Sequence, residues 1–112
     1  MKEYLKLVEN QLEAYNSGDI EKFCQNYHQQ VVVKKLHDTQ VIVKDIEEFR
    51  ELYSKLFQNF PNQKCSIKSR IMVNDSIIDE EMIMGRPTYP DGFHVVAIYS
   101  FRDNLIDRVC FV

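Results

Sequence analysis

The sequence predicts one α+β domain, in which three N-terminal helices precede an antiparallel sheet. Residues up to about 60 show mainly helical periodicity, whereas the residues from Lys64 onward alternate between polar and apolar side chains. Two-residue turns, Asn74-Asp75 and Asp103-Asn104, separate these alternating segments and predict hairpins. A chain of 112 residues without repeats or linkers is expected to form a single domain over residues 1–112.

Three helices are expected before the sheet. Apolar residues at three- and four-residue steps predict the first over residues 3–16, and Gly18 then provides the left-handed C-terminal residue. A second helix is predicted over residues 20–27. Asp45 caps a third helix, with Glu48 three residues later in a capping-box spacing, and Pro61 closes it.

The remaining segments predict strands. Val31-Val32-Val33 begins a short strand toward His37, and Val41-Ile42-Val43 pairs with it. Four antiparallel strands follow between Lys64 and Val112, and the residues from Gly85 to Gly92 form a Pro- and Gly-containing connection between the middle two.

The composition excludes several classes of protein. A net charge of −3 gives no basic footprint for nucleic acid or an anionic membrane. No apolar run approaches the roughly 20 residues of a membrane span, and the charged start Met1-Lys2-Glu3 is unlike a signal peptide. The three scattered cysteines are typical of buried thiols in a reducing cytoplasm, and no histidines and carboxylates have metal-ligand spacing. We therefore expect a cytoplasmic protein without a metal or other cofactor.

Several motifs resemble the NTF2-like superfamily. They are Asn16-Ser17-Gly18-Asp19, Phe23 and Tyr27 before the valine run, and the closing segments 95–99 and 104–109. Arg70-Ile71, residues 78–81 and residues 94–99 are similar, more narrowly, to its SnoaL-like, steroid isomerase-like bacterial branch. The resemblance implies a cone in which a curved sheet wraps around helices and leaves a pocket. It also implies a homodimer formed through the outer sheet face, and functions that range from isomerases and hydrolases to binding modules.

Strand parity predicts which side chains share a face of the sheet. One face contains Asp79, Glu81 and Tyr99 and is assigned to the pocket, whereas the more apolar opposite face is assigned to a dimer partner. The two tight turns and an assumed register across residues 85–92 place Arg70, Asp79, Tyr99 and Arg108 in one row. Two interpretations stay open: a structural ion pair, or a polar floor in which arginine binds an oxyanion of a ligand.

Glu81 is a candidate general base, because a carboxylate beside an apolar neighbour can have a raised pKa. The alternative is a carboxylate paired with Lys68 at the sheet rim.

The resemblance to ketosteroid isomerases places Lys35 near the position of their proton-shuttling aspartate, Gln11 at that of an oxyanion-hole tyrosine, and Tyr99 at that of a protonated aspartic acid. Because two of these three positions depart from the pattern, steroid isomerisation of that type is not expected. His37 is a candidate replacement base or, alternatively, an exposed hairpin residue. Tyr15 belongs to an aromatic stripe that forms core or bounds an apolar cavity.

Two functions remain open at this point. The first is a cone that binds a small apolar or amphipathic molecule with a polar or oxyanion group and acts as an isomerase, lyase or hydrolase. Its catalytic candidates are Asp79, Glu81, Tyr99 and His37, and its ligand-binding candidates are Arg70, Arg108, Lys35, Gln11 and Tyr15. The second is a non-catalytic dimeric module that binds a ligand or another protein.

Overall fold

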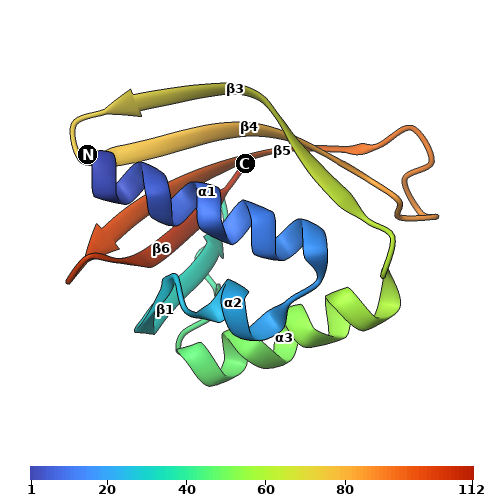
Figure 1. The fold of residues 1–112 in the computed structure, drawn as a ribbon, viewed down its shortest axis with the longest axis horizontal. Helices are drawn as coiled ribbons and strands as arrows, with labels where there is room; N and C mark the ends of the chain where they lie inside the picture. The colour runs from blue at the N-terminus through green and yellow to red at the C-terminus, as the bar shows by residue number, and fades with distance from the viewer.

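Three helices lie on one side of a curved six-stranded sheet in the computed structural model, which describes residues 1–112 (Figure 1). The strands are ordered β2-β1-β6-β5-β4-β3, and all neighbours are antiparallel except β1 and β6. Helix α1 packs near β3 and β6, and α3 packs on β1 and β2. The predicted α+β architecture is confirmed.

The helix ends follow the predicted caps. Helix α1 spans Lys2–Ser17, α2 spans Ile20–Cys24 and α3 spans Ile46–Asn59. Gly18 ends α1 with φ of 70°, in the left-handed region that favours glycine. The Asp45 side chain accepts a hydrogen bond from the Glu48 backbone N–H at 2.9 Å, which caps α3.

The second helix is shorter than predicted, and the strand after it begins earlier. Helix α2 ends at Cys24, and β1 spans Tyr27–Lys35. Tyr27 is therefore a strand residue, buried against the Phe23 and Phe49 rings, with centroid distances of 5.2 and 4.3 Å. Aromatic residues are common in strands, so the four-residue spacing between Phe23 and Tyr27 did not require a helix here.

The other strands match the predicted order. They are β2 (Val41–Val43), β3 (Lys64–Val73), β4 (Ser76–Met84), β5 (Phe93–Arg102) and β6 (Leu105–Phe111). Asn74 and Asp75 form the two-residue turn between β3 and β4, because Val73 pairs directly with Ser76. Asp103 and Asn104 connect β5 to β6 with φ of 54° and 60°, as a type I′ hairpin turn requires.

Four register shifts interrupt the pairing of the sheet, two of them in β1, and the β-bulges in β3 and β6 are the ones that bear on the predicted site. In β3, Ile67 pairs with Glu81 but Ser69 pairs with Glu80, so Lys68 is an extra residue. In β6, Ile106 pairs with Phe101 but Arg108 pairs with Ser100, so Asp107 is extra. Each bulge moves the residues on one side of it to the opposite face from the one that simple parity predicts.

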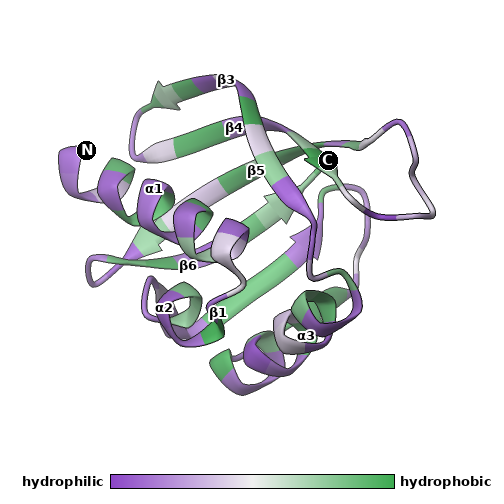
Figure 2. Ribbon diagram, turned by 45° about the vertical axis from the view of Figure 1, so that its right-hand side comes forward, coloured by the Kyte–Doolittle hydropathy of each residue, from purple (hydrophilic) through white to green (hydrophobic).

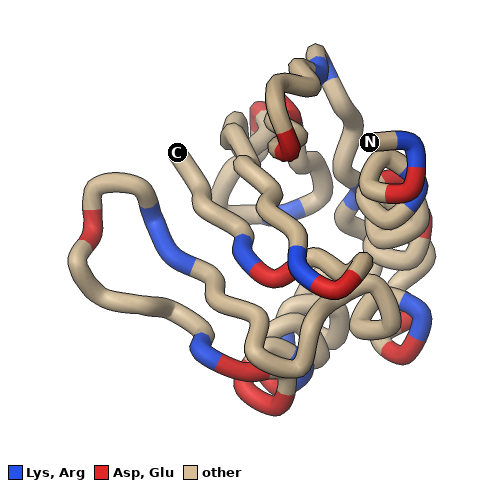
Figure 3. Tube along the Cα trace, turned by 90° about the vertical axis from the view of Figure 1, so that its left-hand side faces the viewer, with Lys and Arg blue, Asp and Glu red and all other residues tan.

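The hydrophobic core lies between the helices and the inner face of the sheet. Its largest fully buried apolar side chains come from both layers: Phe23, Phe49, Ile77, Ile106, Val8, Val31, Val33, Val43 and Val109. Figure 2 shows long hydrophobic stretches in the strands and hydrophilic residues over much of α1. Figure 3 shows acidic and basic residues intermixed along the chain. None of the helices has the length and apolar character that a bilayer crossing requires.

Candidate functional site

A pocket of about 550 Å³ opens between the helices and the inner face of the sheet. Sixteen of its 23 lining residues are hydrophobic, and they come from the helices and several strands. The other seven are Gln11, Lys35, His37, Asp38, Glu81, Arg86 and His94, and the hydrophobic set includes four tyrosines, Tyr15, Tyr27, Tyr53 and Tyr99, and the thiol of Cys65. A concave, largely apolar site with few polar groups is the usual form of a small-molecule site.

Glu81 is the carboxylate that β4 places in this pocket. Its residue is only 5% exposed, and it lies between Ile67 of β3 and Val95 of β5. Burial, followed by the nearby Asp79 charge, raises the Glu81 pKa to about 7, although hydrogen bonds with Tyr99 and Cys65 oppose this rise. Glu81 therefore exists in both protonation states near neutral pH, as a general acid or base requires.

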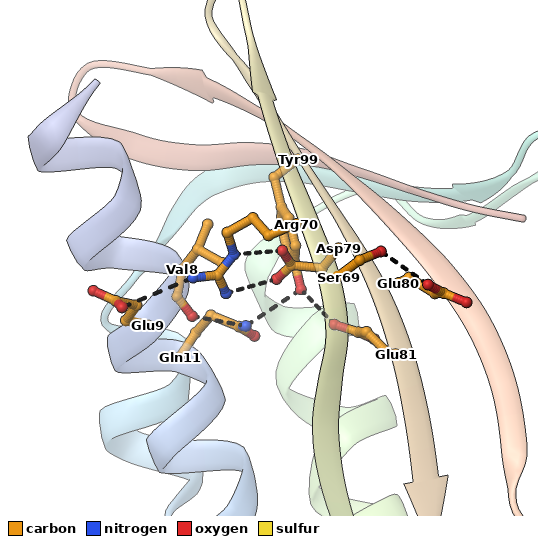
Figure 4. A network of polar contacts seen from close by, with 9 residues as sticks. All are labelled: Val8, Glu9, Gln11, Ser69, Arg70, Asp79, Glu80, Glu81 and Tyr99. Atoms are coloured by element: carbon orange, nitrogen blue, oxygen red, sulfur yellow. Dashed lines mark hydrogen bonds and ion pairs between the residues drawn. The ribbon is translucent and has the colours of Figure 1, made fainter.

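A chain of hydrogen bonds connects Glu81 to Tyr99 and Gln11 (Figure 4). The Tyr99 hydroxyl donates to Glu81 Oε2 at 3.4 Å and accepts a hydrogen bond from Gln11 Nε2 at 3.2 Å. Gln11 Oε1 in turn accepts a hydrogen bond from the Tyr27 hydroxyl at 2.7 Å. Burial raises the pKa of both Tyr27 and Tyr99 far above the ordinary tyrosine value, so both phenols stay protonated as donors.

Arg70 and Asp79 form a bidentate ion pair beside this chain. Arg70 Nε and Nη2 donate to the two Asp79 carboxylate oxygens at 2.6 and 3.0 Å, and Asp79 is completely buried. Arg70 Nη1 also lies 3.8 Å from a Glu9 carboxylate oxygen on α1. Neither member of the pair lines the pocket. Arg70 donates to both oxygens of Asp79, so the geometry favours a structural ion pair over a polar floor that binds a ligand.

The predicted row of four polar residues is wrong beyond its first pair. Arg70 faces Asp79 as expected, but Asp79 faces Ala97, and Tyr99 faces Val109. The shift across residues 85–92 is two positions, so Tyr99 still points inward, where it is 3% exposed.

Arg108 does not belong to the site. The extra residue Asp107 turns the Arg108 side chain to the outer face of the sheet, where it is exposed. Val109 and Phe111 line the pocket in its place. The predicted pairing of Glu81 with Lys68 is also wrong, because Lys68 is the bulge residue of β3.

The other predicted site residues lie around the pocket. Gln11 and Tyr15 contribute to it from α1, and both are buried. Lys35 and His37 line its mouth and are exposed, as the alternative interpretation of His37 predicted. No group of three His, Cys, Asp or Glu side chains is arranged to hold a metal ion.

The sequence reasoning missed Arg86 and Gln63. Arg86 Nε donates to Gln63 Oε1 at 3.0 Å, and one Arg86 Nη2 N–H reaches the Tyr15 hydroxyl at 3.1 Å. Arg86 lies in the Pro- and Gly-containing connection, where no periodicity indicates which way a side chain points. Its one sequence signal was a lone charged residue between Gly85 and Pro87, next to the strand that carries Glu81.

The sequence comparison decides the family. A family model described as the SnoaL-like domain matches residues 8–109, which is nearly the whole chain. This chain belongs to the SnoaL-like family. The predicted resemblance to the NTF2-like superfamily is thereby confirmed. No curated protein matches this SnoaL-like chain.

Solved structures share the fold of this SnoaL-like domain at low sequence identity. An uncharacterised cystatin-fold protein from Novosphingobium aromaticivorans is 23% identical, with a TM-score of 0.87 and 97% of each chain covered. A protein provisionally assigned as a ketosteroid isomerase from Kribbella flavida is 12% identical, with a TM-score of 0.79 over 98% of this chain and 76% of the other. An epoxide hydrolase of the LEH-like type from M. tuberculosis is 14% identical, with a TM-score of 0.77 over 98% and 81%. At these identities the likeness shows the fold alone.

Proposed function

We propose that this SnoaL-like domain binds a small, largely apolar molecule and transfers a proton on it, with Glu81 as the general acid or base. The observation that carries the proposal is a buried carboxylate that lines an apolar pocket and has a pKa of about 7. Such a group can accept a proton from carbon or return it to an adjacent position, because neither protonation state is strongly favoured at neutral pH.

The neighbouring donors suit a substrate with a carbonyl or other oxyanion-forming group. The Tyr99 hydroxyl lies within reach of both Glu81 and Gln11, and the Tyr27–Gln11 hydrogen bond fixes the Gln11 amide. A preorganised donor that stabilises developing negative charge in a water-poor pocket supports enolate-like chemistry. One structural neighbour is provisionally assigned as a ketosteroid isomerase and another is an LEH-like epoxide hydrolase, and these assignments support the proposal by analogy only.

Deuterium wash-in tests this function without knowledge of the natural substrate. A panel of apolar β,γ-enones and ketones in D₂O, followed by NMR, should show exchange at the carbon next to the carbonyl with the wild-type protein. Glu81→Gln should slow this exchange by at least about a hundredfold, because it removes the proton acceptor but keeps the shape. Glu80→Gln is the matched control, since Glu80 lies one residue away but outside the pocket.

The alternative function is a non-catalytic binding module. It is favoured by the mutual hydrogen bonding of Gln11, Tyr27 and Tyr99, which satisfies these groups without a ligand. Panel members that bind without wash-in, or wash-in that Glu81→Gln leaves unchanged, would contradict the catalytic role of Glu81. An interaction module that uses the outer sheet face would show neither binding in the pocket nor exchange.

A further inference from the structure

Arg86 is a pocket arginine without a carboxylate partner. Arg50, Arg70 and Arg102 each form an ion pair with an Asp or Glu, whereas Arg86 and the exposed Arg108, which lies outside the pocket, form none. Its two hydrogen bonds go to neutral oxygens, those of Gln63 and Tyr15. A half-buried guanidinium in an apolar pocket therefore keeps its full positive charge available to a ligand.

Two neutral partners hold the Arg86 side chain in place. Gln63 is 3% exposed, and its Oε1 accepts hydrogen bonds from both Arg86 Nε and the Tyr15 hydroxyl, the latter at 2.7 Å. Gln63 Nε2 donates to the Leu56 carbonyl oxygen of α3 at 3.3 Å, which orients the amide. The donors of Arg86 are thus fixed relative to the end of α3 before any ligand arrives.

Two aromatic rings lie beside the Arg86 guanidinium. The Arg86 guanidinium carbon lies 5.7 Å from the Phe60 ring centroid and 5.5 Å from that of Phe93, which suits cation–π contacts. Nη1 makes no hydrogen bond within the chain, yet every fully buried polar side-chain atom has a partner. Nη1 of Arg86 is therefore not fully buried, and its N–H groups can donate to the oxygens of a ligand.

We infer that Arg86 is a specificity-determining residue that binds a carboxylate, so that the ligand class is an apolar monocarboxylate. The apolar body would occupy the pocket, and its anionic end would meet the Arg86 fork. This inference deepens the proposed function, because it uses the same pocket, but it does not depend on whether Glu81 moves a proton. Lys35, the lysine that lines the pocket, is exposed at the mouth and makes no comparable set of contacts.

Matched acids and amides test the inference. Naphthoate with naphthamide, phenylbutyrate with phenylbutyramide, and decanoate with decanamide each keep one skeleton and change only the charge. Calorimetry should show at least one acid binding about tenfold or more tightly than its amide, since hydrogen bonds between charged partners are about twice as strong as neutral ones. Arg86→Gln should abolish this preference, so that acid and amide bind equally, and Arg86→Lys should restore only part of it.

Arg108→Gln is the matched control, because it removes the same charge from the outer face. In the wild-type protein, acid binding should also move the Arg86 Nε–H resonance in a ¹⁵N spectrum, a readout that does not require the variant to fold. Failure of all three acids to bind, equal binding of acid and amide, or a preference that survives Arg86→Gln would overturn the inference. So would a preference lost in Lys35→Gln but kept in Arg86→Gln.

The two proposals fail separately. Glu81→Gln should keep the preference for acids if the anion site is correct, whatever happens to wash-in. An acid preference without deuterium exchange would therefore reject only the catalytic proposal, and exchange of neutral ketones without an acid preference would reject only the anion site.

Discussion

Glu80 and Glu81 are consecutive in β4, yet their carboxylates lie on opposite faces of the sheet (Figure 4). The Glu80 carboxylate accepts hydrogen bonds from the Ser69 hydroxyl and His94 Nε2, both at 2.8 Å, and these contacts lower its pKa. Burial raises the Glu81 pKa instead. The pKa shifts of two consecutive carboxylates therefore have opposite directions, and a Glu80 variant is a suitable control for a Glu81 variant.

The free energy of unfolding should fall as the pH rises from about 4.5 to about 7, by about 3 kcal/mol from Glu81. Within that window the folded protein keeps the Glu81 proton and the unfolded chain loses it. Below this pH window Glu81 is protonated in both the folded and the unfolded state and does not change the free energy of unfolding. Above the window Glu81 is ionised in both states, and the free energy of unfolding stays lower by the full amount. Urea denaturation of wild type and Glu81→Gln across this range measures the effect. Parallel curves for the two proteins would contradict it.

Removing Arg70 should destabilise the fold strongly. Arg70→Ala leaves Asp79, which is 0% exposed, as an unpaired buried carboxylate, at a cost of about 3–5 kcal/mol. Replacing both partners by apolar residues, Arg70→Met with Asp79→Leu, should recover much of this loss. Arg108→Ala should stay within about 0.5 kcal/mol, because that side chain is exposed. Chemical denaturation tests all three, and an Arg70→Ala protein as stable as Arg108→Ala would refute the interpretation.

A side chain at position 85 should disturb the pocket wall. A Cβ atom on Gly85 would lie 2.8 Å from both the Asn62 carbonyl oxygen and the Gln63 Cα, and its φ is +98°. Gly18 also has a positive φ, +70°, but open space around it. Gly18→Ala should therefore cost only the left-handed strain of about 1–2 kcal/mol, and Gly85→Ala clearly more. Thermal unfolding of the two variants measures the difference. Equal losses of stability would contradict the prediction, because they would show that the backbone around Asn62 and Gln63 moves away from the new Cβ atom at no cost.

We propose that the apolar outer face of the sheet binds a second copy of the chain. Ile98 lies on that face between Ile78 and Cys110, all three half-buried, and Ile71 and Met84 are 58% and 44% exposed. Light scattering at micromolar concentration should give twice the chain mass, and Ile98→Glu should give the monomer. Lys55→Glu, which alters an exposed residue of α3 away from this face, should leave the dimer intact. A monomeric wild type would remove the proposal.

Local sequence signals predicted most of the fold. The Asn74-Asp75 turn fixed the register of Arg70 against Asp79, and the caps at Gly18 and Asp45 fixed two helix boundaries. These features depend on neighbours in the chain, which is why a single sequence was sufficient.

The site was predicted less well, because its geometry depends on non-local effects. Glu81 and Tyr99 were placed inward by parity, but the bulge at Asp107 reversed Arg108, and nothing in the sequence marks that bulge. Arg86 belongs to an irregular connection, and its orientation follows from the distant Gln63 and Tyr15 side chains. Such contacts become visible only when the chain is folded.

The extra residue in β6 shows where this strand can change its length. Asp107 and Arg108 follow the buried Ile106 and precede the buried Val109, and neither of them is buried. Deleting Asp107 would therefore restore regular pairing and leave Val109 at the pocket, whereas a deletion further along β6 would turn the residues after it to the opposite face. Evolutionary gain or loss of a single residue in this strand should therefore concentrate at position 107.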